Sequence, residues 1–304
     1  MMRQVGRPPF EEMSPAEARA AYSAGRPILQ PPPADVAEMR DLTVPGPAGE
    51  IPLRLYRGLG TESGTALPCL LYLHGGGWVV GDLESHDGVC RQLANIAGCC
   101  VVAVDYRMAP EHRFPASVDD AAAAFAGVVA HAGAWGIDPG RIAVGGDSAG
   151  GNLAAVLALM GRDGTLPLPV FQLLIYPAVD LVMTAGSYAR VTSGVPLTAA
   201  TMRWFVDLYV PSPQDRIDWR ASPLRAASLA GAPPAFVMTV AHDPLCDEGR
   251  AYAERLEQEG VAVTALHVGD QPHGLMTMGA VIGPTALYTQ IIGQTLAAGL
   301  RREV

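Results

Sequence analysis

The sequence predicts an α/β protein in which one mostly parallel sheet carries helices on both faces. Short apolar runs alternate with helix-like stretches along most of the chain, which is the pattern of repeated β-α units. Two glycine-rich motifs directly follow apolar runs, as happens where strands of such a sheet turn into loops or helices. The length of 304 residues fits a single sheet of this class, so one domain is expected.

The composition argues against a nucleic-acid partner and against membrane insertion. The formal net charge is −9 and no basic stripe occurs, whereas phosphate binding depends on Lys and Arg side chains. The most apolar runs, residues 67–73 and 121–130, are far shorter than the roughly 20 residues that cross a bilayer.

The N-terminus and the cysteines favour a cytoplasmic location. Residues 1–14 include prolines and glutamates where a signal peptide needs a continuous apolar stretch. The five cysteines, an odd number, occupy positions 69, 90, 99, 100 and 246 without C-x-x-C spacing. Each is interpreted as a small buried hydrophobe, and only Cys246 lies near the proposed chemistry.

The first expected element is a short N-terminal helix. In Ser14-Pro15-Ala16-Glu17 the serine can cap, proline suits the first turn and glutamate can reach back to the cap. The three prolines at 31–33 end this segment.

Seven strands and four helices are expected in alternation beyond it. The strands are expected at residues 51–56, 69–73, 99–104, 141–144, 171–175, 236–240 and 263–267. The helices are expected at residues 116–131, 149–160, 248–258 and 284–300.

One segment, residues 181–223, breaks this alternation. It follows a strand but contains a helical stretch of its own at 198–208 with several aromatic residues. We interpret it as a cap over the site, and ordinary surface packing is the alternative.

A G-x-S-x-G motif at residues 146–150 predicts a nucleophile at Ser148. Apolar residues precede the motif and a helix-like stretch follows it, which gives the strand, sharp turn and helix of a nucleophile elbow. Gly146 and Gly150 lack side chains, so the strand and the helix can approach closely while the serine hydroxyl is exposed.

A second motif, His74-Gly75-Gly76-Gly77 followed by Trp78, directly follows the apolar run at 69–73. Acyl transfer places negative charge on the carbonyl oxygen, and backbone N–H groups of a glycine-rich loop can stabilise that charge. The N–H groups of Gly75, Gly76 and Ala149 are therefore predicted to form the oxyanion hole. His74 is interpreted as a structural member of the loop.

A serine hydroxyl needs a base, and His273 is the best candidate. Three histidines follow Ser148 along the chain: His242 adjoins the best acid candidate, His267 falls within an expected strand, and His273 lies in a polar loop after the last strand.

The acid is sought just after the apolar run at 236–240. Asp243 is the first carboxylate there and is favoured, while Asp247 one helical turn later is the competitor. Either could instead cap the helix that follows.

These motifs resemble the bacterial esterases related to hormone-sensitive lipase, esterase family IV, in the branch with a GDSAG-type motif. The resemblance covers nearly the whole chain: besides HGGGW and GDSAGG, it includes DYRMAPE at residues 105–111, DPLCD at 243–247, and the His273-Gly274 pair. Leu275 replaces a Phe that is common in the family at this position. The match at 243–247 supports Asp243 as the triad acid.

The resemblance implies an α/β-hydrolase fold with an eight-stranded sheet in a single domain. It also implies a cap formed by about residues 1–45 together with 181–223, frequent homodimers, and activity on short acyl esters. Asp105 and Glu111 precede Ser148, and we interpret them as structural residues that pair with Arg107 or fix their loop.

The expected pocket is lined by Trp78, Trp204, Phe205, Tyr209 and Leu275, all of which could equally be core residues. His86, His112 and His131 lack the spacing of a metal site, and neither G-x-G-x-x-G nor G-x-x-x-x-G-K occurs. No metal and no cofactor is therefore expected.

The predicted function is that of a serine carboxylesterase for short-chain acyl esters, acting through an acyl-enzyme on Ser148 with His273 and Asp243. The alternative within enzymes is a deacetylase or lactonase for one metabolite. The alternative of another class is a non-catalytic receptor on the same scaffold, as in the plant gibberellin receptors, which have lost the catalytic histidine.

Overall fold

The fold is built on one eight-stranded sheet. The computed structural model describes residues 8–61 and 64–301, and the sheet order is β1-β2-β4-β3-β5-β6-β7-β8. Strand β2 runs antiparallel to both β1 and β4, and all other neighbours are parallel. The strands are β1 (Glu38–Gly46), β2 (Gly49–Arg57), β3 (Leu67–Leu73), β4 (Cys100–Val104), β5 (Ile137–Asp147), β6 (Gln172–Ile175), β7 (Ala235–His242) and β8 (Val263–Pro272).

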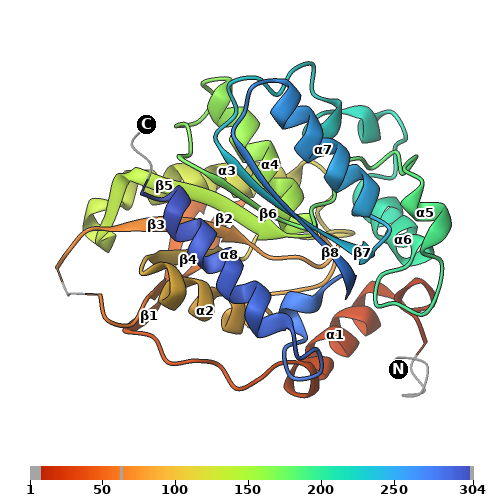
Figure 1. Ribbon diagram of the computed structural model, residues 1–304, viewed down its shortest axis with the longest axis horizontal. Helices are drawn as coiled ribbons and strands as arrows, with labels where there is room; N and C mark the ends of the chain where they lie inside the picture. The colour runs from red at the N-terminus through yellow and green to blue at the C-terminus, as the bar shows by residue number, and fades with distance from the viewer. Residues whose placement is uncertain (1–7, 62–63, 302–304) are drawn as a thin grey trace.

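Helices cover both faces of this sheet. Helices α2 and α8 pack together on one face, while α3, α4 and α7 lie on the other (Figure 1). Short α5 and α6 lie with α1 beyond the end of the sheet at which β7 and β8 terminate (Figure 1). The helices are α1 (Pro15–Leu29), α2 (Asp87–Ala97), α3 (Ala116–His131), α4 (Ala149–Arg162), α5 (Ser187–Arg190), α6 (Ala199–Tyr209), α7 (Cys246–Gln258) and α8 (Thr285–Gly299).

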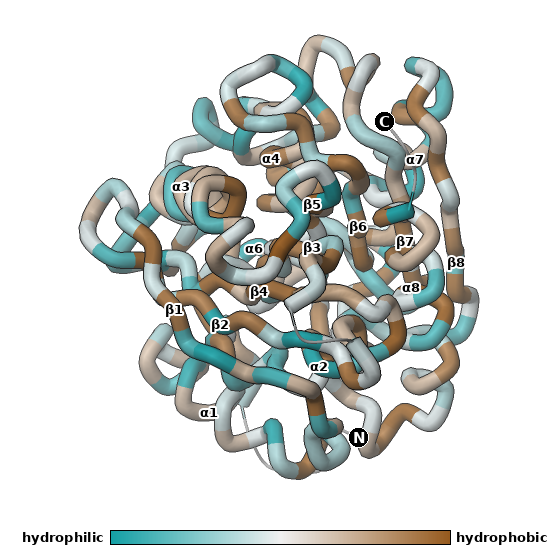
Figure 2. The backbone as a smooth tube through the Cα atoms, turned by 90° about the vertical axis from the view of Figure 1, so that its left-hand side faces the viewer, coloured by the Kyte–Doolittle hydropathy of each residue, from teal (hydrophilic) through white to brown (hydrophobic). Residues whose placement is uncertain are grey.

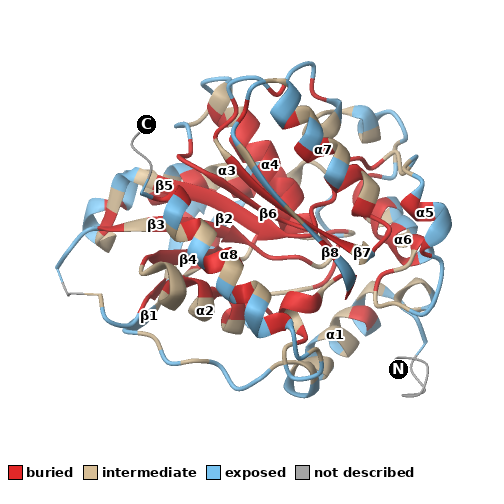
Figure 3. Ribbon diagram, in the orientation of Figure 1, coloured by how far each residue is buried: buried red, intermediate tan, exposed pale blue. Residues whose placement is uncertain are grey.

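The core is centred on the parallel strands. Every residue of β4 and β6 is buried, because helices cover both sides of the sheet there. Helix α4 is buried along nearly its whole length, which explains its continuous apolar sequence. The hydrophobic segments accordingly gather in the central strands, and the outer helix faces and loops are exposed (Figures 2 and 3).

The seven expected strands and the four expected helices are all confirmed, with boundaries shifted by a few residues. The N-terminal helix is also confirmed as α1, and its capping box is present: the Glu17 N–H donates to Ser14 Oγ at 3.3 Å, and the Ser14 N–H donates to Glu17 Oε2 at 2.8 Å.

Strand β1 and helix α2 were not predicted, and neither was the four-residue helix α5 within residues 181–223. Strand β1 lies at the edge of the sheet with most of its side chains at least partly exposed, so its sequence has no apolar run. Helix α2 buries Val89, Cys90 and Leu93 at helical spacing, and this periodicity could have revealed it.

The expected extent of the N-terminal cap segment needs correction. Residues 38–45, assigned to the cap, belong to β1 and therefore to the sheet. Residues 1–7 of that segment lie outside the described residues. The N-terminal helical region consists of α1 and the preceding 3-10 turn at Phe10–Glu12.

Candidate active site

Ser148 lies in a sharp turn between β5 and α4. Its backbone has φ 56° and ψ −119°, a conformation that costs energy for a residue with a side chain and is typical of functional turns. A Cβ atom on Gly150 would overlap the carbonyl oxygen of Leu73, so the predicted close approach of helix and strand requires glycine there. The serine remains 8% exposed at the end of the sheet.

Ser148, His273 and Asp243 form one hydrogen-bonded chain. His273 Nε2 lies 2.8 Å from Ser148 Oγ, and His273 Nδ1 lies 2.8 Å from Asp243 Oδ2. The Asp243 carboxylate fixes the tautomer in which Nδ1 carries the proton, so Nε2 can accept the proton of the serine hydroxyl. Asp243 is fully buried, and its Oδ1 accepts the Leu245 N–H at 2.8 Å.

The competing residues are placed elsewhere. Asp247 forms an ion pair with Arg190 at 2.6 Å on the surface. His267 lies on β8, where its Nδ1 is 3.0 Å from Thr239 Oγ1, and His242 is exposed at the end of β7. Among the candidates from the sequence, the geometry therefore brings only Asp243 and His273 to Ser148.

The glycine-rich loop after β3 differs from the prediction in one donor. The Gly75 N–H already donates to Asp147 Oδ1 at 2.9 Å, so it cannot donate to a substrate oxygen at the same time. Within the part of the chain that the structure describes, no partner accepts the N–H groups of Gly76, Gly77 and Ala149. The available donors are therefore Gly76, Gly77 and Ala149, and the assignment of Gly75 was wrong.

His74 holds the loop rather than acting as a base. Its ring stacks on Tyr106 with the centroids 4.4 Å apart, and its Nδ1 lies 2.8 Å from the Gly75 carbonyl oxygen. Burial, together with the nearby His86, lowers the pKa of His74 to about 4, so the ring is neutral at pH 7.

Three residues predicted to line the pocket do not line open space. Trp78 and Tyr209 are fully buried and stack on each other with ring centroids 4.5 Å apart, and Leu275 is fully buried in the core. These three side chains therefore belong to the packed interior, where aromatic and aliphatic groups fill the space between elements.

Phe205 of α6 lies directly against the oxyanion loop. A Cβ atom on Gly77, which has φ 59°, would overlap the Phe205 ring. Trp204 lies beside Phe205 with the ring centroids 5.1 Å apart and is partly buried. The sequence did not single out Phe10. Its ring lies edge-on to the Phe205 ring, with the centroids 6.1 Å apart, and its centroid is 6.5 Å from that of Tyr22 of α1.

Glu111 pairs with a different arginine from the one predicted. Glu111 forms a bidentate pair with Arg19 of α1, whose shortest distance is 2.6 Å, and does not pair with Arg107. Arg107 instead pairs with buried Asp120 at 2.7 Å. The Arg19 guanidinium also donates to the Val79 carbonyl oxygen at 2.8 Å, so α1 is tied to the segment after the oxyanion loop.

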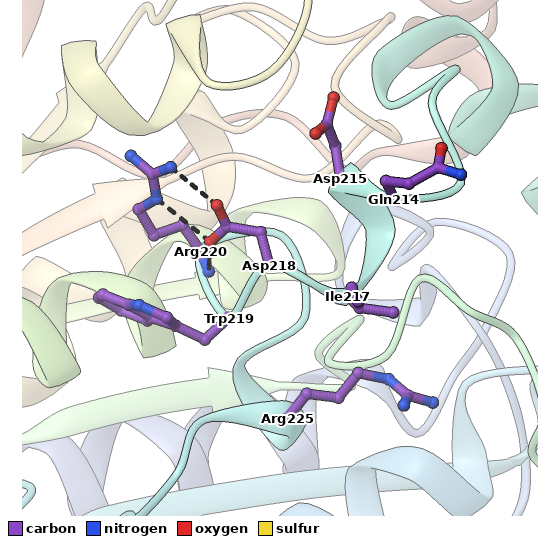
Figure 4. Close-up of a pocket in the computed structure, with 7 residues that line it drawn as sticks. All are labelled: Gln214, Asp215, Ile217, Asp218, Trp219, Arg220 and Arg225. Carbon is purple, nitrogen blue, oxygen red and sulfur yellow. Dashed lines mark hydrogen bonds and ion pairs between the residues drawn. The ribbon is translucent and has the colours of Figure 1, made fainter.

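A surface depression of about 610 Å³ has none of Ser148, Asp243 and His273 in its lining. It is lined by residues between 214 and 225, where Arg220 pairs with Asp218 at 2.7 Å (Figure 4). Arg225 is paired as well, with Asp180 at 2.6 Å. Among the described residues, no group of three or more His, Cys, Asp or Glu could hold a metal ion.

Comparisons with known proteins agree with this fold. A family model described as the alpha/beta hydrolase fold matches residues 70–277. The chain is 45% identical to an ethyl acetate hydrolase of Pseudomonas putida over 233 residues, which are 76% of this chain and 73% of that protein. It is 44% identical to the carboxylic ester hydrolase LipN of Mycobacterium tuberculosis over 271 residues, covering 87% of this chain and 71% of that protein.

Solved structures give the same result. A mutant of an alpha/beta hydrolase enzyme from the metagenome of Lake Arreo superposes with a TM-score of 0.94 at 42% identity, covering 98% of this chain and 93% of that one. An esterase of Pyrobaculum calidifontis superposes with a TM-score of 0.88 at 40% identity, covering 95% and 94% of the two chains.

The sheet order and the elbow define an α/β hydrolase. The chain belongs to this family, in its hormone-sensitive-lipase-like esterase branch, and is a hydrolytic enzyme. Within residues 8–61 and 64–301, no helix combines the length and the hydropathy needed to span a bilayer.

Proposed function

We propose that this enzyme is a serine carboxylesterase that hydrolyses short-chain acyl esters through an acyl-enzyme on Ser148. The observation that supports this most directly is the chain of two 2.8 Å hydrogen bonds from Ser148 through His273 to Asp243. The same geometry disfavours a non-catalytic receptor, because the base is present and already aligned on the serine. A deacetylase or lactonase would use the same residues.

In the proposed reaction, His273 Nε2 removes the proton of Ser148 while Oγ attacks the ester carbonyl carbon. The carbonyl oxygen becomes an oxyanion that the N–H groups of Gly76, Gly77 and Ala149 stabilise, and each such donor is worth ~10²–10³ in rate. Protonated His273 gives its proton to the leaving alcohol as the C–O bond breaks. Water then repeats the attack on the acyl-enzyme and releases the carboxylic acid.

The preference for short acyl groups is supported by the cap. We propose that α1, α5 and α6 form this cap in a single domain with the sheet, because Phe205 packs on Gly77 and Arg19 binds the Val79 carbonyl oxygen. Aromatic rings thus fill the space directly above the oxyanion loop. A relative at 45% identity is named ethyl acetate hydrolase, which is consistent with a small acyl group.

We propose a cytoplasmic location and a homodimer. All five cysteines are buried free thiols, which is the state that a reducing compartment maintains. Size-exclusion chromatography with light scattering tests the oligomeric state.

The first prediction concerns the nucleophile. Ser148→Ala removes the attacking oxygen, so kcat on p-nitrophenyl acetate should fall by about 10⁵-fold or more. A fluorophosphonate should label the native protein on Ser148 and leave the variant unlabelled. Ser193→Ala, which changes an exposed serine, should retain full activity. Full activity in Ser148→Ala would refute the proposal.

The substrate class is tested by kcat/KM for p-nitrophenyl esters from acetyl to dodecanoyl. We expect a maximum between two and six acyl carbons. A maximum at ten or more carbons would identify a lipase instead.

A further inference from the structure

A buried carboxylate, Asp147, connects the two halves of the oxyanion hole, and neither the reaction above nor the sequence motifs assign it a role. It occupies the variable position of G-x-S-x-G, immediately before Ser148, and is 4% exposed. The sequence could have drawn attention to Asp147, because it places a carboxylate directly before Ser148. A carboxylate that is buried there needs hydrogen-bond partners.

Donors from three segments converge on this carboxylate. Tyr72 of β3 donates its hydroxyl to Asp147 Oδ1 at 2.8 Å, and the Gly75 N–H donates to the same oxygen at 2.9 Å. His86, just before α2, places Nε2 3.2 Å from Oδ1. Ser85 Oγ in turn lies 2.9 Å from His86 Nδ1, so the imidazole is held at both nitrogens.

The carboxylate also fixes the loop sterically. A Cβ atom on Gly75 would overlap Asp147 Oδ2, so the carboxylate occupies the space in which a side chain of residue 75 would lie. Asp147 therefore constrains Gly75 in two ways: it accepts the Gly75 N–H, and it leaves no room for a Cβ atom on Gly75. No group within residues 8–61 and 64–301 accepts the N–H groups of the next two residues, Gly76 and Gly77.

The charge state agrees with this arrangement. Burial disfavours the ionised form of Asp147, but attraction to His86 and the hydrogen bonds from His86, Tyr72 and Gly75 outweigh burial and lower its pKa to about 2. The carboxylate is thus an acceptor throughout the neutral pH range.

Building on the proposed function, we propose that Asp147 is a positioning residue that sets the distance between the Gly76 and Gly77 donors and the Ala149 donor. One set of donors is attached to β3 and the other to the elbow after β5. The hydrogen bond from the Gly75 N–H to Asp147 Oδ1 joins these two segments at the residue that precedes Ser148. An oxyanion hole stabilises the transition state only when its donors are already at the right separation.

The predicted effect is a loss of kcat with little change in KM, because the interaction with the oxyanion develops in the transition state. Asp147→Ala should lower kcat on p-nitrophenyl acetate by about 10²-fold or more, comparable to the loss of one donor, with KM within about threefold. The affinity for a boronic acid, which mimics the tetrahedral intermediate, should fall by a similar factor. Asp147→Asn keeps an acceptor at Oδ1, so its kcat should stay within about tenfold of the native enzyme.

The matched control is Asp120→Ala. Asp120 is a buried carboxylate that also accepts a backbone N–H, from Arg107 at 2.9 Å, but its carboxylate bonds to Arg107 and not to the loop at residues 74–78. Its loss should lower the unfolding temperature and leave kcat per folded molecule within about threefold. If Asp147→Ala does not fold, Asp147→Leu fills the same branched volume without an acceptor and is measured instead.

The proposal is overturned if Asp147→Ala or Asp147→Leu keeps kcat within threefold of the native value. It is equally overturned if Asp120→Ala lowers kcat as much as either of these variants. It is also overturned if boronate affinity is unchanged while kcat falls. Fluorophosphonate labelling of Ser148 in the native enzyme is independent of these variants, so failure of this proposal is distinguishable from failure of the proposed function.

Discussion

At the scale of single residues, the site depends on which carboxylate a histidine can reach. Asp243 and Asp247 are separated by one helical turn, yet only Asp243 lies within 2.8 Å of His273 Nδ1. The first is fully buried, and the second is paired with Arg190 at the surface. The chemical roles of the two carboxylates should therefore differ sharply.

Replacing each carboxylate by its amide tests this difference. Asp243→Asn should lower kcat by about 10³–10⁴, because an amide at this position stabilises the wrong tautomer of His273. Asp247→Asn should change kcat by less than about threefold, because an exposed ion pair contributes little. Steady-state kinetics on p-nitrophenyl acetate measure both, and equal losses in the two variants would contradict the assignment.

Local sequence predicted much at this scale. Ser148 and the glycine-rich loop stand in short motifs whose function depends on neighbouring residues along the chain. The use of the Gly75 N–H did not follow from the motif, because its partner, Asp147, is 72 residues away along the chain. The motif alone therefore could not show that the Gly75 N–H is already bound.

At the scale of elements, helix α6 and the oxyanion loop pack as one unit. Phe205 and Tyr209, one helical turn apart, lie on Gly77 and Trp78 respectively. Residues four apart lie on the same side of a helix, so Phe205 and Tyr209 can contact two neighbouring residues, Gly77 and Trp78. A change at either position should act on the space above the oxyanion hole.

Truncation of Phe205 should enlarge that space. Phe205→Ala removes the ring that lies against Gly77, so kcat/KM for octanoyl relative to acetyl p-nitrophenyl esters should rise severalfold. Tyr209→Phe keeps the stacked ring and should leave the ratio within twofold. An unchanged ratio in Phe205→Ala would show that this ring does not limit acyl length.

Elements with strong patterns were predicted and those with weak patterns were not. The buried parallel strands are continuous apolar runs, whereas charged and polar residues interrupt the apolar ones in β1 at the sheet edge. Its pairing with β2, which on the β1 side uses mostly residues that are at least partly exposed, appears only in the tertiary structure.

At the scale of the whole molecule, the region of α5 is joined to the scaffold next to Asp243, the proposed triad acid. Glu248 of α7 is 2% exposed, and its Oε1 accepts the Val179 N–H at 2.8 Å and the Asp180 N–H at 3.2 Å. Its Oε2 accepts the Tyr188 hydroxyl of α5 at 2.9 Å. Ser187 Oγ also donates to the Pro244 carbonyl oxygen, so α5 is fixed on the segment that carries Asp243.

This buried carboxyl group should make stability depend on pH. Burial raises the pKa of Glu248 from 4.5 to about 8, despite the opposing hydrogen bonds. The folded protein keeps a proton that the unfolded chain releases, so the free energy of unfolding should fall as pH rises from 4.5 to 8, by on the order of 1 kcal/mol per pH unit.

Glu248→Gln should reduce that dependence. The amide oxygen can still accept two N–H groups, the Tyr188 hydroxyl can turn to accept, and no proton is exchanged. The unfolding temperature of the variant should match the native protein near pH 4.5 and exceed it at pH 8. Glu254→Gln, an exposed position on the same helix, should follow the native curve. Parallel curves for Glu248→Gln and the native protein would contradict the prediction.

The sequence by itself determined the α/β class, most strand and helix positions, and where the candidate nucleophile and the glycine-rich loop lie along the chain. Each of these depends on residues that are close along the chain, where periodicity and motif spacing act directly. The tertiary structure decided which carboxylate meets His273, which N–H groups remain free, and whether Trp78 lines a pocket or packs. These outcomes depend on distances between segments that only the assembled sheet brings together, and no local pattern encodes them.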